Sequence, residues 1–149
     1  MSGDERWMRR ALLLARRGRR GAAPNPMVGC VLVKDGKIVG EGYHSRFGGP
    51  HAEPLALKRA GAGSRGATAY VTLEPCCAHP GKKTPPCADA LLKAGVSRLV
   101  AASLDPNPGV SGAGLRILRR AGVSVQVGVL AEQARRLNAG FFSRMRRGR

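Results

Sequence analysis

The chain has few aromatic side chains and no long apolar run. Phe, Trp and Tyr make up only 4% of its 149 residues, so the core must be built mainly from Val, Leu, Ile and Ala. No apolar run approaches the ~20 residues that a membrane-spanning helix needs. The apolar patch at residues 11–15 is short and has Arg on both sides, unlike a secretory signal. These absences predict a single cytoplasmic domain over residues 1–149 and no membrane partner.

Acidic residues are scarce as well. The chain has 26 Lys and Arg against 9 Asp and Glu, which gives a formal net charge of +17. The basic ends carry most of the excess, with seven Arg in residues 1–20 and six in residues 131–149. This distribution is typical of nucleic-acid or acidic-partner binding, or of solvated helix faces in an Arg-rich protein. Only Trp7, Phe141 and Phe142 lie among these arginines, too few for base stacking, so nucleic acid is not the expected partner.

Apolar periodicity predicts alternating helices and strands. A hairpin is expected around Asp35-Gly36, a dipeptide that favours two-residue turns between β-branched runs. The expected helices cover residues 4–17, 51–60, 87–94, 115–121 and 131–145, and the expected strands cover 27–34, 38–43, 67–73, 96–103 and 123–129. Strands separated by helices of about ten residues imply parallel pairing through right-handed crossovers. We therefore predict an α/β fold, a three-layer α/β/α sandwich with a mixed sheet of about five strands.

His and Cys are few, but they are clustered in a pattern that indicates a metal site. His51 precedes Glu53 by two residues, and a second segment holds Cys76 and Cys87. One imidazole and two thiolates can hold a zinc ion and leave one position open for water. A carboxylate two residues from the His can reach that water without binding the metal, and can pass its proton to a departing nitrogen. This chemistry is hydrolytic deamination, with His51, Cys76 and Cys87 as ligands and Glu53 as the proton carrier.

The second cysteine departs from the usual spacing of zinc deaminases. Their form is H-x-E followed by P-C-x-x-C, whereas here Cys87 comes eleven positions after Cys76. Cys87 also opens an expected helix, whose N-terminus would stabilise a thiolate. Two alternatives stay open: Cys77 competes with Cys76, or Cys77 or His79 supplies the fourth ligand of a structural zinc site. Cys30 lies in an apolar strand and is expected to pack in the core.

Several segments of the chain, spread over residues 5 to 145, resemble the deaminase domain of the bifunctional riboflavin-biosynthesis deaminase/reductase. The matching segments are Pro24-Asn25-Pro26-Met27-Val28-Gly29-Cys30-Val31, Gly42-Tyr43-His44, His51-Ala52-Glu53, Thr72-Leu73-Glu74-Pro75-Cys76, Thr84-Pro85-Pro86-Cys87-Ala88-Asp89-Ala90 and Asp105-Pro106-Asn107-Pro108. The resemblance implies a cytidine-deaminase-like fold. It also implies a phosphorylated pyrimidine substrate, 2,5-diamino-6-(5-phosphoribosylamino)pyrimidin-4(3H)-one, which would lose ammonia to give the 5-amino-uracil ribotide.

The resemblance also implies a role for individual residues. It carries zinc binding to His51, Cys76 and Cys87, and proton transfer to Glu53. The implied substrate contacts are Asn25 and His44 beside the pyrimidine, His79 with Lys82 or Lys83 at the phosphate, Thr84 in the same loop, and Asp105 and Asn107 in a turn after a strand. A phosphorylated substrate favours cations on such a loop, although solvated lysines are also common. Asp105 and Asn107 equally suit a purely turn-forming role.

The chain departs from the family in two respects. The link between Cys76 and Cys87 is longer than the family's usual one, which leaves open whether Lys82 or Lys83 meets the phosphate. The chain also ends about where the family's reductase domain would begin, and no G-x-G-x-x-G follows a strand. We therefore expect one catalytic zinc ion, no nicotinamide cofactor and no reductase domain.

Two other functions fit the sequence less well than this deaminase activity. A deaminase of a nucleoside or of a base in tRNA would favour the close P-C-x-x-C spacing that this chain lacks. A nucleic-acid-binding module with a structural zinc would leave Glu53 without a task. Similarity to the family suggests a homo-oligomer, and a separate reductase is a candidate partner for the basic ends.

Overall fold

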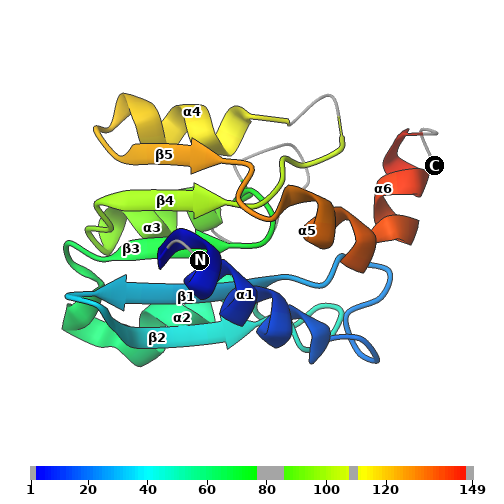
Figure 1. Ribbon diagram of the computed structural model, residues 1–149, viewed down its shortest axis with the longest axis horizontal. Helices are drawn as coiled ribbons and strands as arrows, with labels where there is room; N and C mark the ends of the chain where they lie inside the picture. Colours follow the sequence, from blue (N-terminus) through cyan, green and yellow to red (C-terminus); the bar gives the residue numbers. More distant parts are fainter. Residues whose placement is uncertain (1–2, 77–85, 108–110, 147–149) are drawn as a thin grey trace.

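The computed structural model describes residues 3–76, 86–107 and 111–146. Its helices pack around a central sheet (Figure 1). In chain order the elements are α1 (Gly3–Arg16), β1 (Gly29–Lys34), β2 (Lys37–Tyr43), α2 (Ala52–Ala60), the 3₁₀ turn η1 (Gly61–Ser64), β3 (Thr68–Val71), α3 (Cys87–Lys93), β4 (Arg98–Ala101), α4 (Ala113–Arg120), β5 (Ser124–Val127), α5 (Ala131–Leu137) and α6 (Ala139–Arg146).

The five strands form one mixed sheet in the order β2-β1-β3-β4-β5. Strand β1 runs antiparallel to both β2 and β3, whereas β3, β4 and β5 are parallel to one another. Helices α3 and α4 provide the long connections that parallel neighbours need. The predicted mixed sheet and its parallel half are therefore confirmed.

The hairpin between β1 and β2 forms at the predicted turn. Asp35 and Gly36 both have positive φ, 51° and 73°, as a type I′ turn requires. On β2, Gly40 leaves room for α2, because a Cβ there would lie 2.3 Å from the carbonyl oxygen of Ala56. The close approach of α2 to β2 brings the start of that helix to the end of the hairpin.

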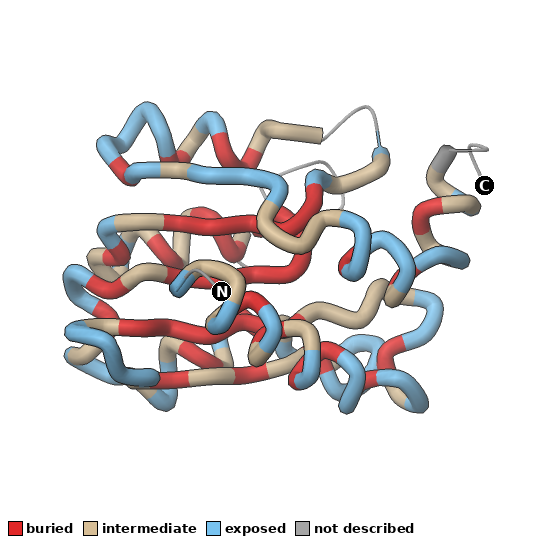
Figure 2. Tube along the Cα trace, viewed as in Figure 1, coloured by how far each residue is buried: buried red, intermediate tan, exposed pale blue. Residues whose placement is uncertain are grey.

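The sheet separates two apolar cores, one on each face. Along β1, Cys30 and Leu32 pack with buried residues of α2, α3 and α4, whereas Val31 and Val33 pack with buried residues of α1 and α5. This strict alternation follows from the two-residue period of a strand. Figure 2 shows the buried residues concentrated in the central strands, with the outer sides of the helices exposed. The predicted three-layer arrangement is thus confirmed.

The helix predicted over residues 131–145 is wrong in one respect, because two helices occupy this segment. Helix α5 ends at Leu137 and α6 begins at Ala139. Asn138 between them is 7% exposed and has φ −113° and ψ 35°. Its side chain accepts a hydrogen bond from the Met27 backbone N–H at 2.8 Å and donates one to the Met27 carbonyl at 2.8 Å. We attribute the break to this contact, which apolar periodicity does not reveal.

A polar contact fixes α1 to the sheet. Asp4, in the first turn of α1, accepts hydrogen bonds from Arg98 at 2.8 and 2.9 Å and from the Tyr70 hydroxyl at 2.8 Å. The Arg98 guanidinium holds the pKa of Asp4 below its usual value. Burial, together with the neighbouring Asp4 carboxylate, raises the pKa of Tyr70 to about 12. These three residues join α1, β3 and β4.

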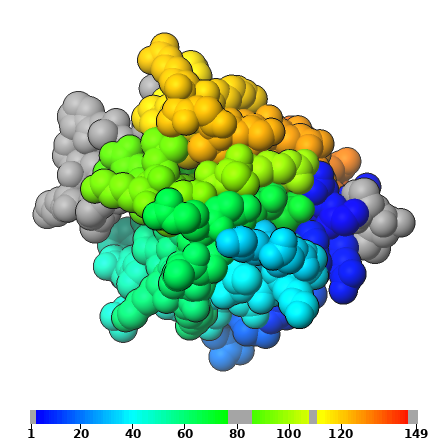
Figure 3. Space-filling view, turned by 90° about the vertical axis from the view of Figure 1, so that its left-hand side faces the viewer, coloured from blue at the N-terminus to red at the C-terminus, as the bar shows by residue number. Residues whose placement is uncertain are grey.

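The end of the sheet that carries the β1–β2 turn is seen face-on in Figure 3. There the surface passes from the cyan β1–β2 hairpin through green segments to the yellow and orange region of α4 and β5. The candidate site described below lies at the other end, where β3 and β4 terminate. Within the described ranges, every helix is too short or too polar to cross a bilayer.

Candidate active site

A cavity of about 270 Å³ lies where β3 and β4 end, at the edge of an α/β sheet where ligand sites gather. We call it the His–Cys pocket. Six of the residues named from the sequence line it: Asn25, His44, His51, Glu53, Cys76 and Asp105. The structure therefore gathers these six residues from segments up to eighty positions apart in the chain. Phe141 and Leu73 add apolar surface to the wall.

Three side chains in this region form a group that could hold a metal ion. His51 Nδ1 lies 3.3 Å from Cys87 Sγ and 3.8 Å from Cys76 Sγ. The ligand atoms of the three residues all lie within 4.8 Å of one another. Around a tetrahedral zinc, Zn–S distances of about 2.3 Å and Zn–N distances of about 2.0–2.1 Å separate N from S by about 3.6 Å and two S atoms by about 3.8 Å. The spacing and the donor set therefore fit zinc.

Two of these three residues lie at the N-terminus of a helix. His51 directly precedes α2 with extended backbone angles, and Cys87 is the first residue of α3. The backbone N–H of Cys87 donates a hydrogen bond to Cys76 Sγ at 3.2 Å. Such an N–H favours the thiolate form that a metal ligand needs. The long link between Cys76 and Cys87 therefore still allows both sulfur atoms to lie at one candidate metal site.

Glu53 is buried beside this group, with only 3% of the residue exposed. Burial disfavours the charged carboxylate and raises its pKa to about 7, and the nearby Cys76 adds to the rise. His51 and a hydrogen bond with Cys87 act in the opposite direction. A carboxyl group whose pKa lies near 7 can both accept and return a proton at neutral pH. This property suits the proton carrier expected from the sequence.

Asn25 and His44, which both line the pocket, form a hydrogen-bonded pair. Asn25 Nδ2 lies 3.1 Å from His44 Nε2, and His44 Nδ1 lies 2.9 Å from the Pro50 carbonyl oxygen. A carbonyl can only accept, so we infer that Nδ1 carries the proton and that Nε2 accepts from Asn25. The ring of His44 also meets the ring of His51 edge-on, at 5.3 Å between centroids. This pair fixes the Asn25 amide at the pocket wall.

Glu74 lines the pocket, and sequence reasoning gave it no role of its own. It is 6% exposed, and its carboxylate accepts hydrogen bonds from the backbone N–H groups of Asp105 at 2.8 Å and Gly112 at 2.8 and 3.0 Å. Burial raises its pKa, while these two N–H groups oppose the rise. Glu74 thus joins the loop of Cys76 to the loop of Asp105. An acidic residue just before Pro-Cys, in a chain with only 9 acidic residues, was the available signal.

Asn138 is a second residue that the sequence did not indicate. Its two hydrogen bonds to Met27 hold the segment that carries Asn25 and Pro26, both of which line the pocket. The contact joins residues 111 positions apart, so no local pattern could have predicted it.

The remaining candidates divide into three groups. Asn107 is exposed and does not line the pocket, and its backbone N–H donates to Asp105 Oδ1 at 2.9 Å, which is the geometry of an Asx turn. Cys30 is fully buried in the core, in agreement with its predicted packing role. Burial raises the pKa of its thiol. Cys77, His79, Lys82, Lys83 and Thr84 lie outside the described residues.

Fold and site together define a cytidine-deaminase-like protein: a five-stranded mixed sheet with a His/Cys/Cys group and a buried Glu at its edge. Residues 1–103 match the cytidine and deoxycytidylate deaminase zinc-binding region. The chain therefore belongs to the cytidine and deoxycytidylate deaminase family, within which it is similar to diaminohydroxyphosphoribosylaminopyrimidine deaminases.

Two relatives show how far this similarity extends. The chain is 59% identical over 145 residues to the riboflavin biosynthesis protein RibD of Escherichia coli, covering 97% of this chain and 39% of that protein. It is 50% identical over 145 residues to the diaminohydroxyphosphoribosylamino-pyrimidine deaminase of Buchnera aphidicola subsp. Schizaphis graminum, covering 97% of both chains. The chain thus spans about two fifths of the length of relatives such as RibD.

Solved structures agree with this assignment. The structure of Acinetobacter baumannii RibD superposes with a TM-score of 0.92 at 51% identity, covering 95% of this chain and 40% of that one. A dCMP deaminase from the cyanophage S-TIM5 shares the fold, with a TM-score of 0.62 at 24% identity, and covers 85% of this chain and 99% of that one.

Proposed function

We propose that this chain catalyses the zinc-dependent hydrolytic deamination of 2,5-diamino-6-(5-phosphoribosylamino)pyrimidin-4(3H)-one in riboflavin biosynthesis. Water replaces the amino group, so the products are the 5-amino-uracil ribotide and ammonia. The observation that carries the proposal is the His51, Cys76 and Cys87 group with the buried Glu53 beside it. Similarity over nearly the full length of a relative that bears the deaminase's name supports this choice of substrate.

His51, Cys76 and Cys87 would hold the metal, because their spacing and chemistry fit zinc. When bound, zinc supplies the Lewis acidity that makes water a nucleophile near neutral pH. Glu53 takes the proton from the attacking water and delivers it to the departing amino nitrogen, which leaves as ammonia. Burial raises the pKa of this carboxyl group, which favours the return of the proton to the departing nitrogen.

The pocket walls suit a pyrimidine. Asn25, fixed by its hydrogen bond with His44, offers an amide to the ring edge, and Asp105 lies in the same cavity. We keep His79, Lys82, Lys83 and Thr84 as predicted phosphate-side contacts, and Asn107 as a predicted contact that its turn geometry explains equally well. Phe141 and Leu73 exclude water from one wall and so strengthen the polar contacts inside.

The test is an ammonia assay on purified protein with measured zinc content. The diaminopyrimidine ribotide is supplied, with cytidine and an adenosine-containing tRNA hairpin as comparators. We expect ammonia only from the ribotide. Turnover of a comparator without turnover of the ribotide would overturn the substrate, and folded protein that binds no zinc would overturn the mechanism.

Four finer predictions accompany this function. We predict a single zinc ion per chain, a cytoplasmic location, a homo-oligomer and contact with a separate reductase. Residues 1–149 are predicted to act as one deaminase domain without nicotinamide binding. Sedimentation tests the homo-oligomer, and a reductase assay with added NADPH tests the prediction that this chain does not bind nicotinamide.

A further inference from the structure

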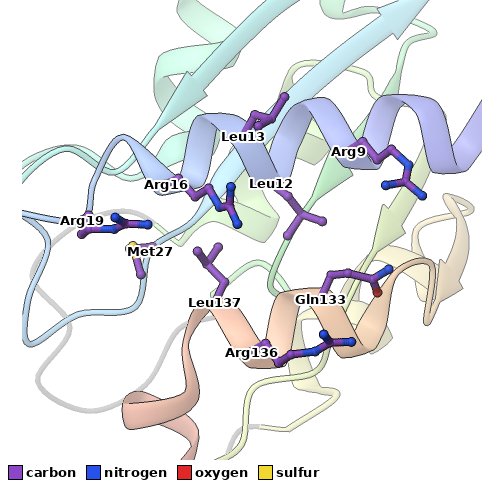
Figure 4. Close-up of a pocket in the computed structure, with 9 residues that line it drawn as sticks. All are labelled: Arg9, Leu12, Leu13, Arg16, Arg19, Met27, Gln133, Arg136 and Leu137. Carbon is purple, nitrogen blue, oxygen red and sulfur yellow. The ribbon is translucent and has the colours of Figure 1, made fainter.

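A second cavity, of about 520 Å³, lies between α1 and α5, the two helices that cover one face of the sheet (Figure 4). Four arginines line it, and we call it the arginine groove: Arg9 and Arg16 from α1, Arg19 just beyond it, and Arg136 from α5. The side chains of Leu12 and Leu137 point from the two helices into the space between them. The groove is therefore basic at its rim and apolar between its walls.

The arginines of the groove differ from other arginines of the same chain. Arg10 and Arg98 are paired with Glu41 and Asp4, at 2.6 and 2.8 Å. In contrast, no side-chain hydrogen bond or ion pair joins Arg9, Arg16 or Arg19 to another described residue.

The ion pair that described residues form at the groove is weak. Arg136 lies 3.8 Å from Glu132, and both side chains are more than 70% exposed. Among the described residues, none of those that line the groove is acidic. The positive charge here is thus available to a ligand.

The apolar residues of the groove restrict what this ligand can be. Leu13 is 53% exposed and lines the groove with Met27. An inorganic anion would pair with the arginines but would leave these apolar side chains in water. Within the part of the chain that the structure describes, the groove has no aromatic lining residue on which bases could stack. A second copy of this chain, with a net charge of +17, would bring like charges together.

The spacing of Arg9 and Arg16 fits acidic side chains presented by a helix of the ligand. Arg9 and Arg16 are seven residues apart on α1, so they lie on one face about 10 Å apart along the helix axis. Carboxylates at positions i and i+7 of a ligand helix have the same separation, and apolar residues at i+3 and i+4 would face the leucines. We propose that the arginine groove is a docking site for an acidic amphipathic helix of another protein. This site is separate from the deamination chemistry.

Anisotropy of a fluorescein-labelled helical peptide tests the proposal. The probe carries Glu at i and i+7 and Leu at i+3 and i+4, and a matched peptide replaces Glu by Gln. We expect binding of the Glu peptide that weakens with salt, and loss of binding for the Gln peptide. The double variant R16Q/R136Q should weaken binding roughly 25-fold, about a factor of five for each charge-assisted contact.

The control is R119Q/R120Q, which removes the same charge from exposed positions on α4. It should bind the Glu peptide like the unaltered chain, and thermal melting confirms that both variants fold. An equal loss in the control would overturn the groove as the site and indicate diffuse attraction. Unchanged affinity of a Leu13→Ala variant would overturn the apolar part. Groove-dependent binding of single-stranded RNA in preference to the Glu peptide would replace the protein partner by nucleic acid.

Discussion

The arginine groove and the His–Cys pocket differ in size, in the burial of their charged groups and in chemistry. The arginine groove is the larger, about 520 Å³ against about 270 Å³, but its charged groups are exposed. The His–Cys pocket holds a buried carboxylate, Glu53, whose pKa is raised to about 7. Cavity volume therefore does not identify the reactive site. Burial of an ionisable group next to potential metal ligands does, because desolvation changes its proton affinity.

The two cavities also meet at one point. Met27 lines the arginine groove, whereas its neighbours Pro26 and Asn25 line the His–Cys pocket. Asn138 holds this segment through the Met27 backbone. The difference between the two regions can thus be tested with substitutions that affect one, the other or both.

The largest effect is expected from Glu53→Gln, compared with Arg16→Gln. Removing the proton carrier should lower kcat for ammonia release on the order of 1,000-fold, because Gln cannot accept the proton of water. Zinc content should not change, since Glu53 is not among the predicted ligands. Arg16→Gln should leave turnover unaltered. If the two variants lost activity equally, the assignment of chemistry to the His–Cys pocket would be wrong.

Asn138→Ala should affect both regions. It removes both hydrogen bonds to the half-buried backbone of Met27, which costs about 1–2 kcal/mol of the free energy of unfolding. KM for the ribotide should rise as the Asn25 segment loosens. Urea unfolding and steady-state kinetics measure the two effects. The exposed Gln133 on α5 provides the control, since Gln133→Ala should leave the free energy of unfolding nearly unaltered.

Glu74→Gln should act on the pocket alone. The new amide nitrogen cannot accept from the Gly112 N–H, so the Asp105 loop loses part of its attachment to the Cys76 loop. We expect KM to rise about tenfold while kcat and zinc content change little. A fall in kcat with constant KM would instead place Glu74 in the chemical step. Glu132→Gln, at an exposed position, is the matched control.

The smallest effect is expected from Asp4→Asn, which loosens the wall of the arginine groove without touching the pocket. The folded pKa of Asp4 is lowered, so its contribution to stability is present above the unfolded pKa of about 3.9 and is lost as the pH falls through the folded value. We expect a loss of about 1 kcal/mol at neutral pH, because the pair is partly exposed. Urea unfolding curves of the two proteins should converge once the pH falls below the folded pKa of Asp4, and ammonia release at neutral pH should be equal.

The parts of the fold that depend on short-range patterns were predictable. Asp35-Gly36 placed the hairpin, because this dipeptide readily adopts the two consecutive positive φ values that a type I′ turn needs. The continuous apolar run over Cys30 to Val33 predicted a strand, and the structure buries both of its faces. His51 and Glu53, taken together with Cys76 and Cys87, indicated deaminase chemistry before any geometry was known, although the resemblance was needed to name a substrate.

The parts that failed or were missed depend on contacts between distant segments. Periodicity predicted one helix where Asn138 divides two, because its partner Met27 lies 111 positions away. Glu74 was quoted only as part of a motif, since the backbone N–H groups that it binds belong to another loop. The charge of the basic ends was visible, but not which arginines would pair with acids and which would line a groove.

The sequence alone determined the order of elements, the excess of arginine and the residue types able to bind zinc and carry a proton. These features depend on spacing along the chain, where helix and strand periods and turn propensities act over a few residues. Only the tertiary structure decided that Cys76 and Cys87 meet His51, that burial raises the pKa of Glu53, and that four arginines converge between α1 and α5. Burial and convergence depend on which distant segments pack together, because desolvation and pairing are properties of the assembled core.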